Sequence, residues 1–371
     1  MREQLIRYIN IFLILLQMKK LIFINLTPNT IGDTLFLTPI FKIIKKTYPK
    51  IEIHITVSPS NYNLLENNPH IDKIIKIPQL ERISKKISKI KKIREYLIMY
   101  FKLLKTLKKG KYDIAIVGQP NFFLSQSLPW MAQIRKRIGY TYPGSIFSNM
   151  LTNKIKFTDP LKIHKRHYLE GNIDLIKPLN PKITEDDKKV YKKITQKELD
   201  VAKKILKSRN INSNFICVQA GAKWIEKEWP KKKFKELCKI LSKKQNIILL
   251  GSKKEYKLNQ YIKNNNKNIY NLSGLKLNKT SAILKLSKLL IGNDSGLTHL
   301  ATAVGTDTVT IYGISDYFHS KPLGNNNNKI AVFAGNHAPS KLYREDTKKS
   351  IEMMDAISLE KVLSAINKLN L

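Results

Sequence analysis

Cysteines, acidic residues and long apolar runs are scarce in this sequence. Its 371 residues include only two cysteines, Cys217 and Cys238, which excludes a disulfide framework and a cysteine-based metal site. Both lie in a predicted strand or helix, so we interpret them as core residues of a protein in a reducing compartment. The apolar patch at residues 9–16 is too short to span a bilayer.

The first 17 residues do not have the pattern of a secretory signal, because no small-residue cleavage site follows the apolar patch. Residues 18–20 lead directly into a strong strand pattern over residues 21–26. Two interpretations stay open. Either Met18 is the true start of the protein, or residues 1–17 form a weak amphipathic anchor.

Acidic residues number 28 against 67 lysines and arginines, which gives a formal net charge of +39. Such a charge is typical of proteins that bind nucleic acid or anionic membranes. The sequence has no zinc-finger spacing, RNA-recognition aromatic motif or basic zipper, so we expect no specific nucleic-acid partner. We interpret the excess as a compositional lysine bias with functional charge superimposed on it.

The length and the order of the predicted elements indicate two α/β domains. Helical patterns alternate with predicted strands, which are residues 21–26, 51–57, 74–77, 114–117, 215–218, 247–250, 269–272, 289–291 and 308–312. A polar, proline-containing stretch predicts a boundary between domains at 18–180 and 196–350, with a final helix within 355–371. We expect two Rossmann-like, doubly wound domains that face each other across a cleft, with the ligand site at the carboxyl ends of the strands.

Residues 82–109 form a lysine-rich helical segment with a stripe of Ile, Leu, Tyr and Phe. One interpretation is a solvated helix whose stripe packs on the sheet. The other is a basic amphipathic face that lies against anionic lipid headgroups. The two are compatible, because a helix can pack one face and present lysines on another.

A short apolar run at residues 289–291 leads into a polar turn, residues 293–296, and then into a helix of small residues. Such a turn presents backbone N–H groups and the positive end of a helix dipole, which suit a diphosphate. The alternative is that Asp294 or Ser295 only caps the helix and that His299 fills a corner.

Two more motifs follow the first strand of each half. In the first half, Asp33 after Gly32 lies in the predicted loop, where a carboxylate either caps the next helix or accepts a proton from a hydroxyl. In the second half, Gly221 allows close backbone approach, while Lys223 and Lys227 offer cations for phosphate.

Together these motifs resemble the heptosyltransferase family, glycosyltransferase family 9. The resemblance runs from about residue 21 to the C-terminus. The matching pieces, in order, are residues 31–35 with Thr38-Pro39 and Tyr48-Pro49, Gly221-Ala222 with residues 227–230, residues 293–296 with residues 299–301, and Tyr312-Gly313.

The resemblance implies a GT-B enzyme that transfers heptose from ADP-heptose, with inversion, to a lipid A or inner-core acceptor in lipopolysaccharide biosynthesis. Such an enzyme would be cytoplasmic and peripheral to the inner membrane, with a phosphorylated glycolipid acceptor and an anionic membrane surface as partners. The ADP-sugar would be a substrate, and no cofactor is expected. Because no strand-terminal Asp-x-Asp occurs, no obligatory metal is expected either.

The resemblance also implies roles for individual residues. Asp33 would be the general base on the acceptor hydroxyl, Lys227 would contact the donor diphosphate, and Asp294 would hold the donor sugar. The remaining donor-binding residues would be Gly221, Ser295, Gly296, Leu297 and His299.

Three other functions stay open. The same fold can use another nucleotide sugar for core, capsule or glycoprotein assembly. A basic nucleic-acid-binding protein would bind nucleic acid in a salt-sensitive way that survives loss of Asp33 and Asp294. A non-catalytic relative would bind glycan only.

Overall fold

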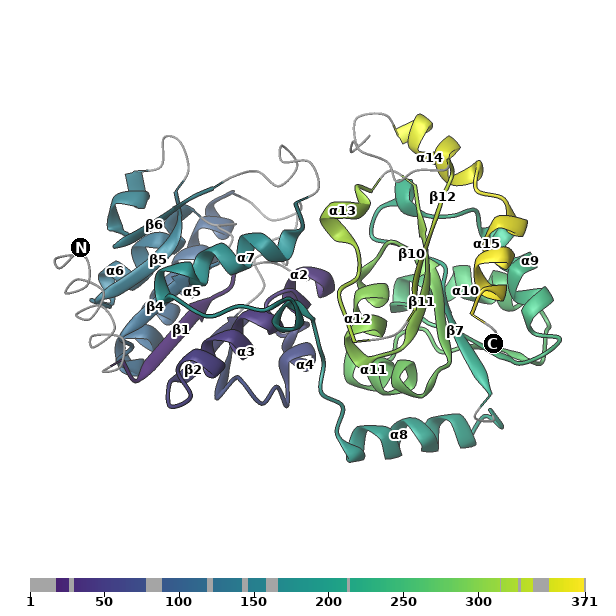
Figure 1. Ribbon diagram of the computed structural model, residues 1–371, viewed down its shortest axis with the longest axis horizontal. Coiled ribbons are helices and arrows are strands. Elements are labelled where there is room, and N and C mark those ends of the chain that lie inside the picture. Colours follow the sequence, from purple (N-terminus) through teal and green to yellow (C-terminus); the bar gives the residue numbers. More distant parts are fainter. Residues whose placement is uncertain are drawn as a thin grey trace. The chain divides into compact units, whose positions relative to one another are not determined.

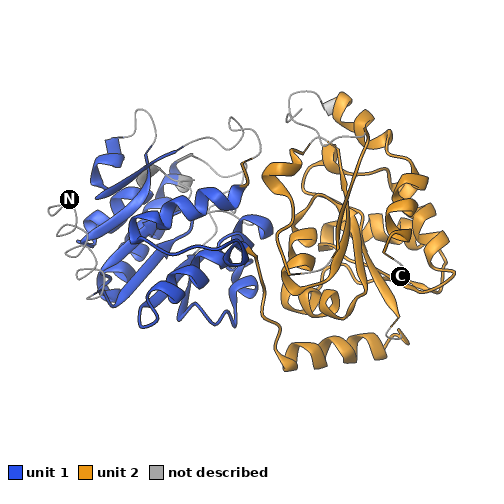
Figure 2. Ribbon diagram, in the orientation of Figure 1, with its two compact units in different colours: residues 1–159, 168–188 blue, residues 160–167, 189–371 orange. Residues whose placement is uncertain are grey.

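The chain divides into two compact units in a computed structural model (Figure 2). Unit 1 comprises residues 1–159 and 168–188, and unit 2 comprises residues 160–167 and 189–371. The structure describes residues 18–26, 30–77, 89–118, 123–141, 146–157, 166–211, 214–313, 315–325, 328–335 and 347–369. Residues 1–17, with the two interpretations of the N-terminus, lie outside these described residues.

Unit 1 is a parallel sheet covered by helices (Figure 1). The strands of its described part are β1 (Lys20–Ile24), β2 (Glu52–Val57), β3 (Lys73–Lys76), β4 (Ile114–Val117), β5 (Lys136–Thr141) and β6 (Asn153–Lys156). The α-helices of the same part are α2 (Ile31–Leu35), α3 (Thr38–Thr47), α4 (Tyr62–Leu65), α5 (Lys89–Gly110), α6 (Ser127–Met131) and α7 (Tyr168–Ile176).

Unit 2 repeats this architecture. Its described strands are β7 (Phe215–Gln219), β8 (Asn246–Leu249), β9 (Ile269–Asn271), β10 (Leu289–Asn293), β11 (Asp307–Tyr312) and β12 (Lys329–Phe333). Its described α-helices are α8 (Gln196–Lys207), α9 (Lys231–Leu241), α10 (Tyr256–Lys263), α11 (Leu277–Leu286), α12 (Gly296–Val304), α13 (Tyr317–Ser320), α14 (Thr347–Asp355) and α15 (Leu359–Asn367).

The two sheets have the same topology within the described residues. Their orders are β3-β2-β1-β4-β5-β6 and β12-β11-β10-β7-β8-β9, and all the pairings are parallel. Counted within each unit, both orders are 3-2-1-4-5-6, with the switch between the first and fourth strands. In unit 1 this register sets Phe23 of β1 between Ile55 and Ile116. The predicted class, α/β with two doubly wound sheets, is confirmed.

The strands predicted from the sequence all form, and each begins and ends within two residues of the predicted position. By contrast, β5, β6 and β12 are absent from the sequence-based prediction. Of these, β6 and β12 are edge strands, and β5 begins with Lys136 and Arg137. Edge strands have one side open to solvent, so they carry charge and a weaker apolar pattern.

The lysine-rich segment is helical where the structure describes it, as α5. Leu103, Leu104 and Leu107 of α5 are buried in the core of unit 1, so the prediction that the stripe packs on the sheet is confirmed for this part of the helix. Within the described part of the chain, no helix combines the length and the apolar character needed to cross a membrane.

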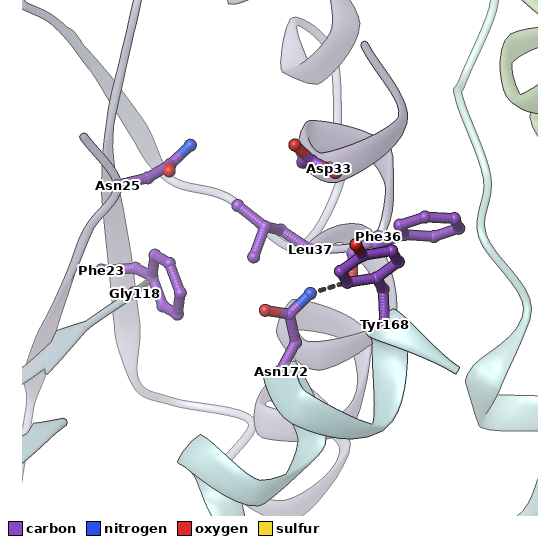
Figure 3. A pocket seen from close by; sticks show the side chains of 8 residues that line it. All are labelled: Phe23, Asn25, Asp33, Phe36, Leu37, Gly118, Tyr168 and Asn172. Carbon is purple, nitrogen blue, oxygen red and sulfur yellow. Dashed lines mark hydrogen bonds between the residues drawn. The ribbon is translucent and has the colours of Figure 1, made fainter. Parts of the chain in front are cut away.

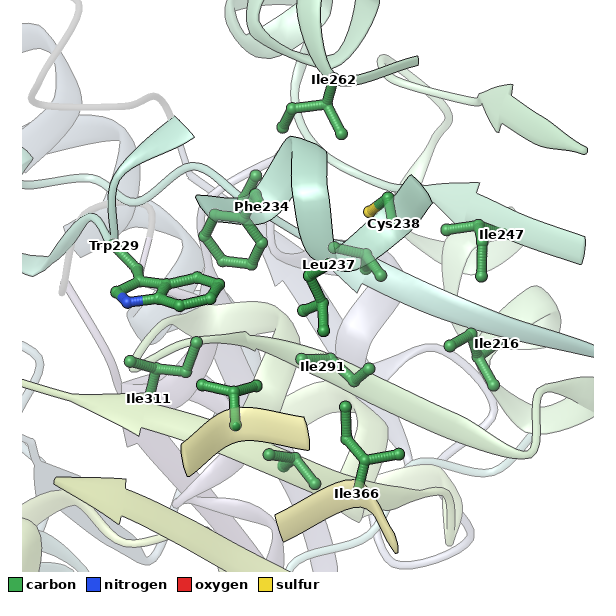
Figure 4. Packing of buried hydrophobic residues seen from close by; sticks show 14 of the residues in the cluster. Ile216, Trp229, Phe234, Leu237, Cys238, Ile247, Ile262, Ile291, Ile311 and Ile366 are labelled. Atoms are coloured by element: carbon green, nitrogen blue, oxygen red, sulfur yellow. The ribbon is translucent and has the colours of Figure 1, made fainter. Parts of the chain in front are cut away.

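The core of unit 2 lies between its sheet and helices α9 and α15 (Figure 4). Trp229 is fully buried there and meets Phe234 edge to face at 5.0 Å between ring centroids. Its indole N–H donates to the Ile357 carbonyl at 2.9 Å. Cys217 and Cys238 are buried free thiols, as predicted, and burial raises the pKa of Cys217 to about 12.

We predict that Trp229→Phe lowers the free energy of unfolding by about 2–3 kcal/mol, because it leaves a void and removes the indole hydrogen bond. Trp224→Phe is the matched control, since the Trp224 side chain is 52% exposed, and it should change this free energy by less than about 0.5 kcal/mol. Urea titration followed by circular dichroism measures both. Equal effects of the two substitutions would contradict a structural role for Trp229.

Candidate functional site

Both units place polar residues at the topological switch of their sheets. In unit 1, Asn25 follows β1 and Gly118 follows β4, the two strands that adjoin the switch. In unit 2, the loop after β7 leads to Lys227, and Asp294 follows β10. At such a point neighbouring loops leave the sheet in opposite directions and open a crevice at its carboxyl edge.

A pocket opens at this edge of unit 1 (Figure 3). Its lining residues are Phe23, Asn25, Asp33, Phe36, Leu37, Gly118, Tyr168 and Asn172. Asp33 was expected in a loop, but it lies in the first turn of the short helix α2. The N-cap position belongs to Thr30, so the capping role weighed for Asp33 is wrong.

Buried amides hold α2 in place. The Asn61 side-chain amide donates to Thr34 Oγ1 at 2.8 Å and to the Thr30 carbonyl at 3.3 Å. The Asn172 amide donates to the Phe36 carbonyl, just after α2, at 3.1 Å. Among the described residues, none forms a hydrogen bond or ion pair with the Asp33 carboxylate. The carboxylate is therefore available to a ligand in the pocket.

Asn293, at the end of β10, organises the switch of unit 2. Its buried side-chain oxygen accepts from the Trp229 backbone N–H at 3.0 Å, and its amide N–H donates to the Ala220 carbonyl at 2.7 Å. Both bonds reach the loop that runs from β7 to α9. One neutral side chain thus fixes both ends of the segment that carries Gly221 and Lys227.

The structure brings together Lys227 and Asp294, which the sequence places 67 residues apart. Lys227 Nζ donates to Asp294 Oδ2 at 2.6 Å, and the side chains are 20% and 3% exposed. Burial alone would raise the pKa of Asp294, but the charges of Lys227 and His299 and the hydrogen bond from Lys227 hold it below its ordinary value. Asp294 is therefore an ion-pair partner and does not cap α12.

The beginning of α12 has no side-chain cap. Ser295 occupies the N-cap position, but its hydroxyl donates to Gln219 Oε1 instead of accepting from the first turn. Gly296 and Leu297 begin the helix, and the buried His299 lies one turn further along. An uncapped helix start beside a lysine is a favourable place for an anion.

Gly221 lies under a carboxylate that the sequence does not reveal. A Cβ at Gly221 would collide with the Glu255 side chain, which accepts from the Ser252 backbone N–H at 2.6 Å. Glu228 accepts from the Ala222 N–H at 2.9 Å, and burial raises its pKa. The positions of Asn25 and Gly118 directly after strands, and of Asn293 at the end of one, are a usable signal. The contact made by Glu255, by contrast, depends on tertiary packing.

Lys223, the second cation of the motif, is exposed, and its Nζ lies 6.0 Å from the centre of the Trp224 ring. The described residues contain no group of three or more His, Cys, Asp or Glu side chains that could hold a metal ion. The charged groups of the unit 2 site are thus Lys227, Asp294, Glu228 and Glu255.

Two doubly wound parallel units form the GT-B fold, and solved structures share this fold. The *Escherichia coli* ADP-heptose lipopolysaccharide heptosyltransferase II matches with a TM-score of 0.73 at 20% identity, over 95% of this chain and 98% of that one. The *E. coli* heptosyltransferase WaaC with ADP-2-deoxy-2-fluoro heptose matches with a TM-score of 0.63 at 17% identity, over 94% and 99%.

A sequence profile of glycosyltransferase family 9 (heptosyltransferase) matches residues 100–351. The chain belongs to this family and is a glycosyltransferase. It is also similar to lipopolysaccharide heptosyltransferase 3 of *E. coli* (strain K12), with 25% identity over 350 residues, which cover 91% of this chain and 95% of the relative. The resemblance seen in the motifs is confirmed.

We predict that Asp294→Asn lowers the free energy of unfolding at pH 7 by about 1–3 kcal/mol, because the charged hydrogen bond from Lys227 is weakened. The pKa of Asp294 is lowered in the folded state, so its ionised form stabilises the fold above the ordinary carboxyl pKa. The difference between wild type and variant should therefore shrink as the pH falls below about 5.

Urea titrations at several pH values measure this difference. Asp187→Asn is the matched positive control, because Asp187 is a buried carboxylate of unit 1 that pairs with Lys46 at 2.8 Å. Its pKa is also lowered, against the effect of burial, by Lys46 and Thr184. A constant difference between wild type and Asp294→Asn at all pH values would show that the ionised Asp294 does not stabilise the fold.

Proposed function

We propose that the protein transfers heptose from ADP-heptose to a lipid-linked, phosphorylated sugar acceptor in lipopolysaccharide core assembly, with inversion at the anomeric carbon. The observation that carries this proposal is the Lys227–Asp294 pair beside the uncapped beginning of α12. A diphosphate leaving group needs a cation and oriented N–H groups, and this edge of unit 2 offers both. The relatives whose names mention ADP-heptose or lipopolysaccharide support the choice of substrates.

Lys227 is suited to hold Asp294 and a phosphate at the same time. A lysine ammonium has three N–H donors, and one of them is used by Asp294. The other donors are available for the donor diphosphate, so Lys227 would stabilise the negative charge on departing ADP. Ser295, Gly296 and Leu297 would cradle the phosphates through their backbone.

Asp294 would accept a hydrogen bond from a hydroxyl of the donor sugar, because its carboxylate stays ionised and is held in one orientation by Lys227. His299 lies about one turn into α12 and would donate a hydrogen bond to the diphosphate. Gly221 would let the nucleotide approach the backbone. The Glu255 side chain occupies the space that a side chain at this position would need.

On the acceptor side, Asp33 would act as general base in the unit 1 pocket. The acceptor hydroxyl oxygen attacks the anomeric carbon, its proton passes to the Asp33 carboxylate, and the bond to the ADP oxygen breaks with its electron pair leaving on ADP. A single displacement of this kind inverts the anomeric centre. The charge on ADP is met by Lys227 and N–H groups, so we propose that no metal and no cofactor is required.

The proposed acceptor also suggests where in the cell the protein acts. We propose that the protein is cytoplasmic and peripheral to the inner membrane, because a glycolipid acceptor is anchored in a bilayer. The net charge of +39 suits both an anionic membrane and a phosphorylated acceptor.

We predict that Asp33→Asn lowers kcat for transfer from ADP-heptose to a lipid A acceptor by about 10²–10⁴-fold, because the acceptor hydroxyl loses its base. The affinity for ADP should stay within about twofold, since Asp33 lies outside the donor-binding residues. Asp174→Asn is the control, because Asp174 is a carboxylate of unit 1 that pairs with Lys177 outside the pocket. Unchanged turnover in Asp33→Asn would remove Asp33 from the mechanism.

We predict that calorimetric titration with ADP, UDP, GDP and CMP gives tightest binding for ADP, with or without EDTA. Lys227→Met should weaken ADP binding by at least about tenfold, because a charge-assisted contact to the diphosphate is lost. Lys46→Met is the control, since Lys46 pairs with a buried aspartate of unit 1 instead.

Other outcomes of this titration have distinct meanings. Tighter binding of UDP or GDP would support a glycosyltransferase that uses a different nucleotide sugar as its donor. Binding of ADP that disappears in EDTA would contradict the metal-independent mechanism. No response to any nucleotide, together with salt-sensitive binding of nucleic acid that survives Asp294→Asn, would favour the nucleic-acid alternative.

A further inference from the structure

Helix α5 of unit 1 has an apolar face that points away from the core. Ile90, Ile93, Leu97 and Phe101 follow one another at intervals of three or four residues, so they share one side of the helix. Their exposed fractions run from 45% to 81%. Leu104, three residues after Phe101, is buried, so these exposed residues continue the apolar stripe of α5 beyond the part that packs on the sheet. We call these four residues the α5 face.

Cations border the α5 face. Among the described side chains of this helix, the exposed basic residues are Arg94, Lys102, Lys105, Lys108 and Lys109. Among the described side chains of α5, Glu95 is the one acid, and it is partly buried. The surface therefore combines apolar groups with positive charge.

Lysine bias does not explain this combination, as helix α8 shows. Lys203, Lys204 and Lys207 of α8 are exposed, yet none of the large apolar residues of that helix is exposed. A basic helix that is only solvated thus looks different from α5. The two helices differ in that α5 exposes large apolar side chains and α8 does not.

The neighbouring helix α6 also carries exposed apolar residues. It packs on α5 through Tyr100, whose hydroxyl bonds with Ser127 Oγ at 2.6 Å. Trp130 and Met131, at the end of α6, are both exposed. An indole ring with an apolar body and a polar N–H is typical of the interface between headgroups and acyl chains.

We propose that the α5 face docks on an anionic lipid bilayer, with the apolar side chains at the acyl boundary and the cations among the headgroups. Long lysine side chains suit this position, because their stems cover apolar surface while their ammonium groups reach phosphate. The docking deepens the proposed function, since it would bring unit 1 to a membrane-anchored acceptor. It is nevertheless measurable without donor or acceptor.

Charge favours a bilayer over a second copy of the chain. A two-fold interface sets the same patch of both copies against each other. The cations of one copy would then face the like charges of the other, which disfavours association. Anionic phospholipid headgroups complement the same cations.

The test is co-sedimentation with vesicles that contain no glycolipid, made either of phosphatidylglycerol and phosphatidylethanolamine or of phosphatidylcholine alone. Wild type should bind the anionic vesicles and not the neutral ones. The triple variant Ile93→Gln, Leu97→Gln, Phe101→Gln should lose at least about tenfold in affinity, because its apolar insertion is gone. Lys102→Glu with Lys105→Glu should weaken binding to a similar degree.

The matched control is the triple variant Lys203→Gln, Lys204→Gln, Lys207→Gln on α8, which should change affinity by less than about threefold. Circular dichroism checks the fold of each variant. The proposal is wrong if the α5 apolar variant binds vesicles as tightly as wild type does. It is also wrong if the α8 variant loses as much vesicle affinity as the α5 variants do. A wild-type dimer that dissociates in the apolar variant, seen by analytical ultracentrifugation, would assign the α5 face to a second copy instead.

The vesicle-binding test and the heptose-transfer test can fail independently of each other. With an acceptor whose acyl chains have been removed, the α5 apolar variant should keep the transfer rate of wild type. If neither protein transfers heptose but wild type still docks through α5, the proposed function fails and the docking stands.

Discussion

The side-chain amide of Asn293 is the constraint on which the candidate site of unit 2 depends. By bonding to both the Trp229 N–H and the Ala220 carbonyl, it fixes the loop from β7 to α9 against the end of β10. Lys227 lies just before Trp229, and Asp294 follows Asn293, so the same two bonds set the ion pair at 2.6 Å. Burying a neutral amide whose hydrogen bonds are all made costs less free energy than burying a charge, so this side chain is a suitable anchor.

An ion pair is not the only arrangement that could stabilise the fold at this position. Taking a carboxylate out of water is costly, and an apolar pair of similar size would stabilise a domain equally well or better. We propose that a binding site is the better reason for the pair. Asp294 keeps the Lys227 ammonium in one place before any ligand arrives, so the binding of a phosphate would require little reorganisation. Trp229, buried at the start of the next helix, supports this arrangement from the core.

Strands with continuous or alternating apolar runs, such as residues 289–291, were predictable from the sequence. The edge strands β6 and β12 and the interior strand β5 were not, since β6 and β12 have a mixed pattern and β5 begins with two basic residues. The same limit applies to the site. Asp294 and Lys227 are visible as motif residues, but their pairing, the one-turn helix under Asp33 and the contact of Glu255 with Gly221 arise from tertiary packing. Exposure of the α5 face is likewise a property of the folded chain.

The two candidate aspartates show how one topology can supply different chemistry. Both Asp33 and Asp294 belong to segments beside a sheet switch, yet their surroundings differ. Asp294 is buried against Lys227, which stabilises the carboxylate and makes it a poor proton acceptor. Asp33 has no partner among the described residues and lies in a pocket whose lining contains no lysine or arginine. Because the two environments differ, we propose different tasks for the two carboxylates: Asp294 orients a ligand, and Asp33 accepts the proton of the acceptor hydroxyl.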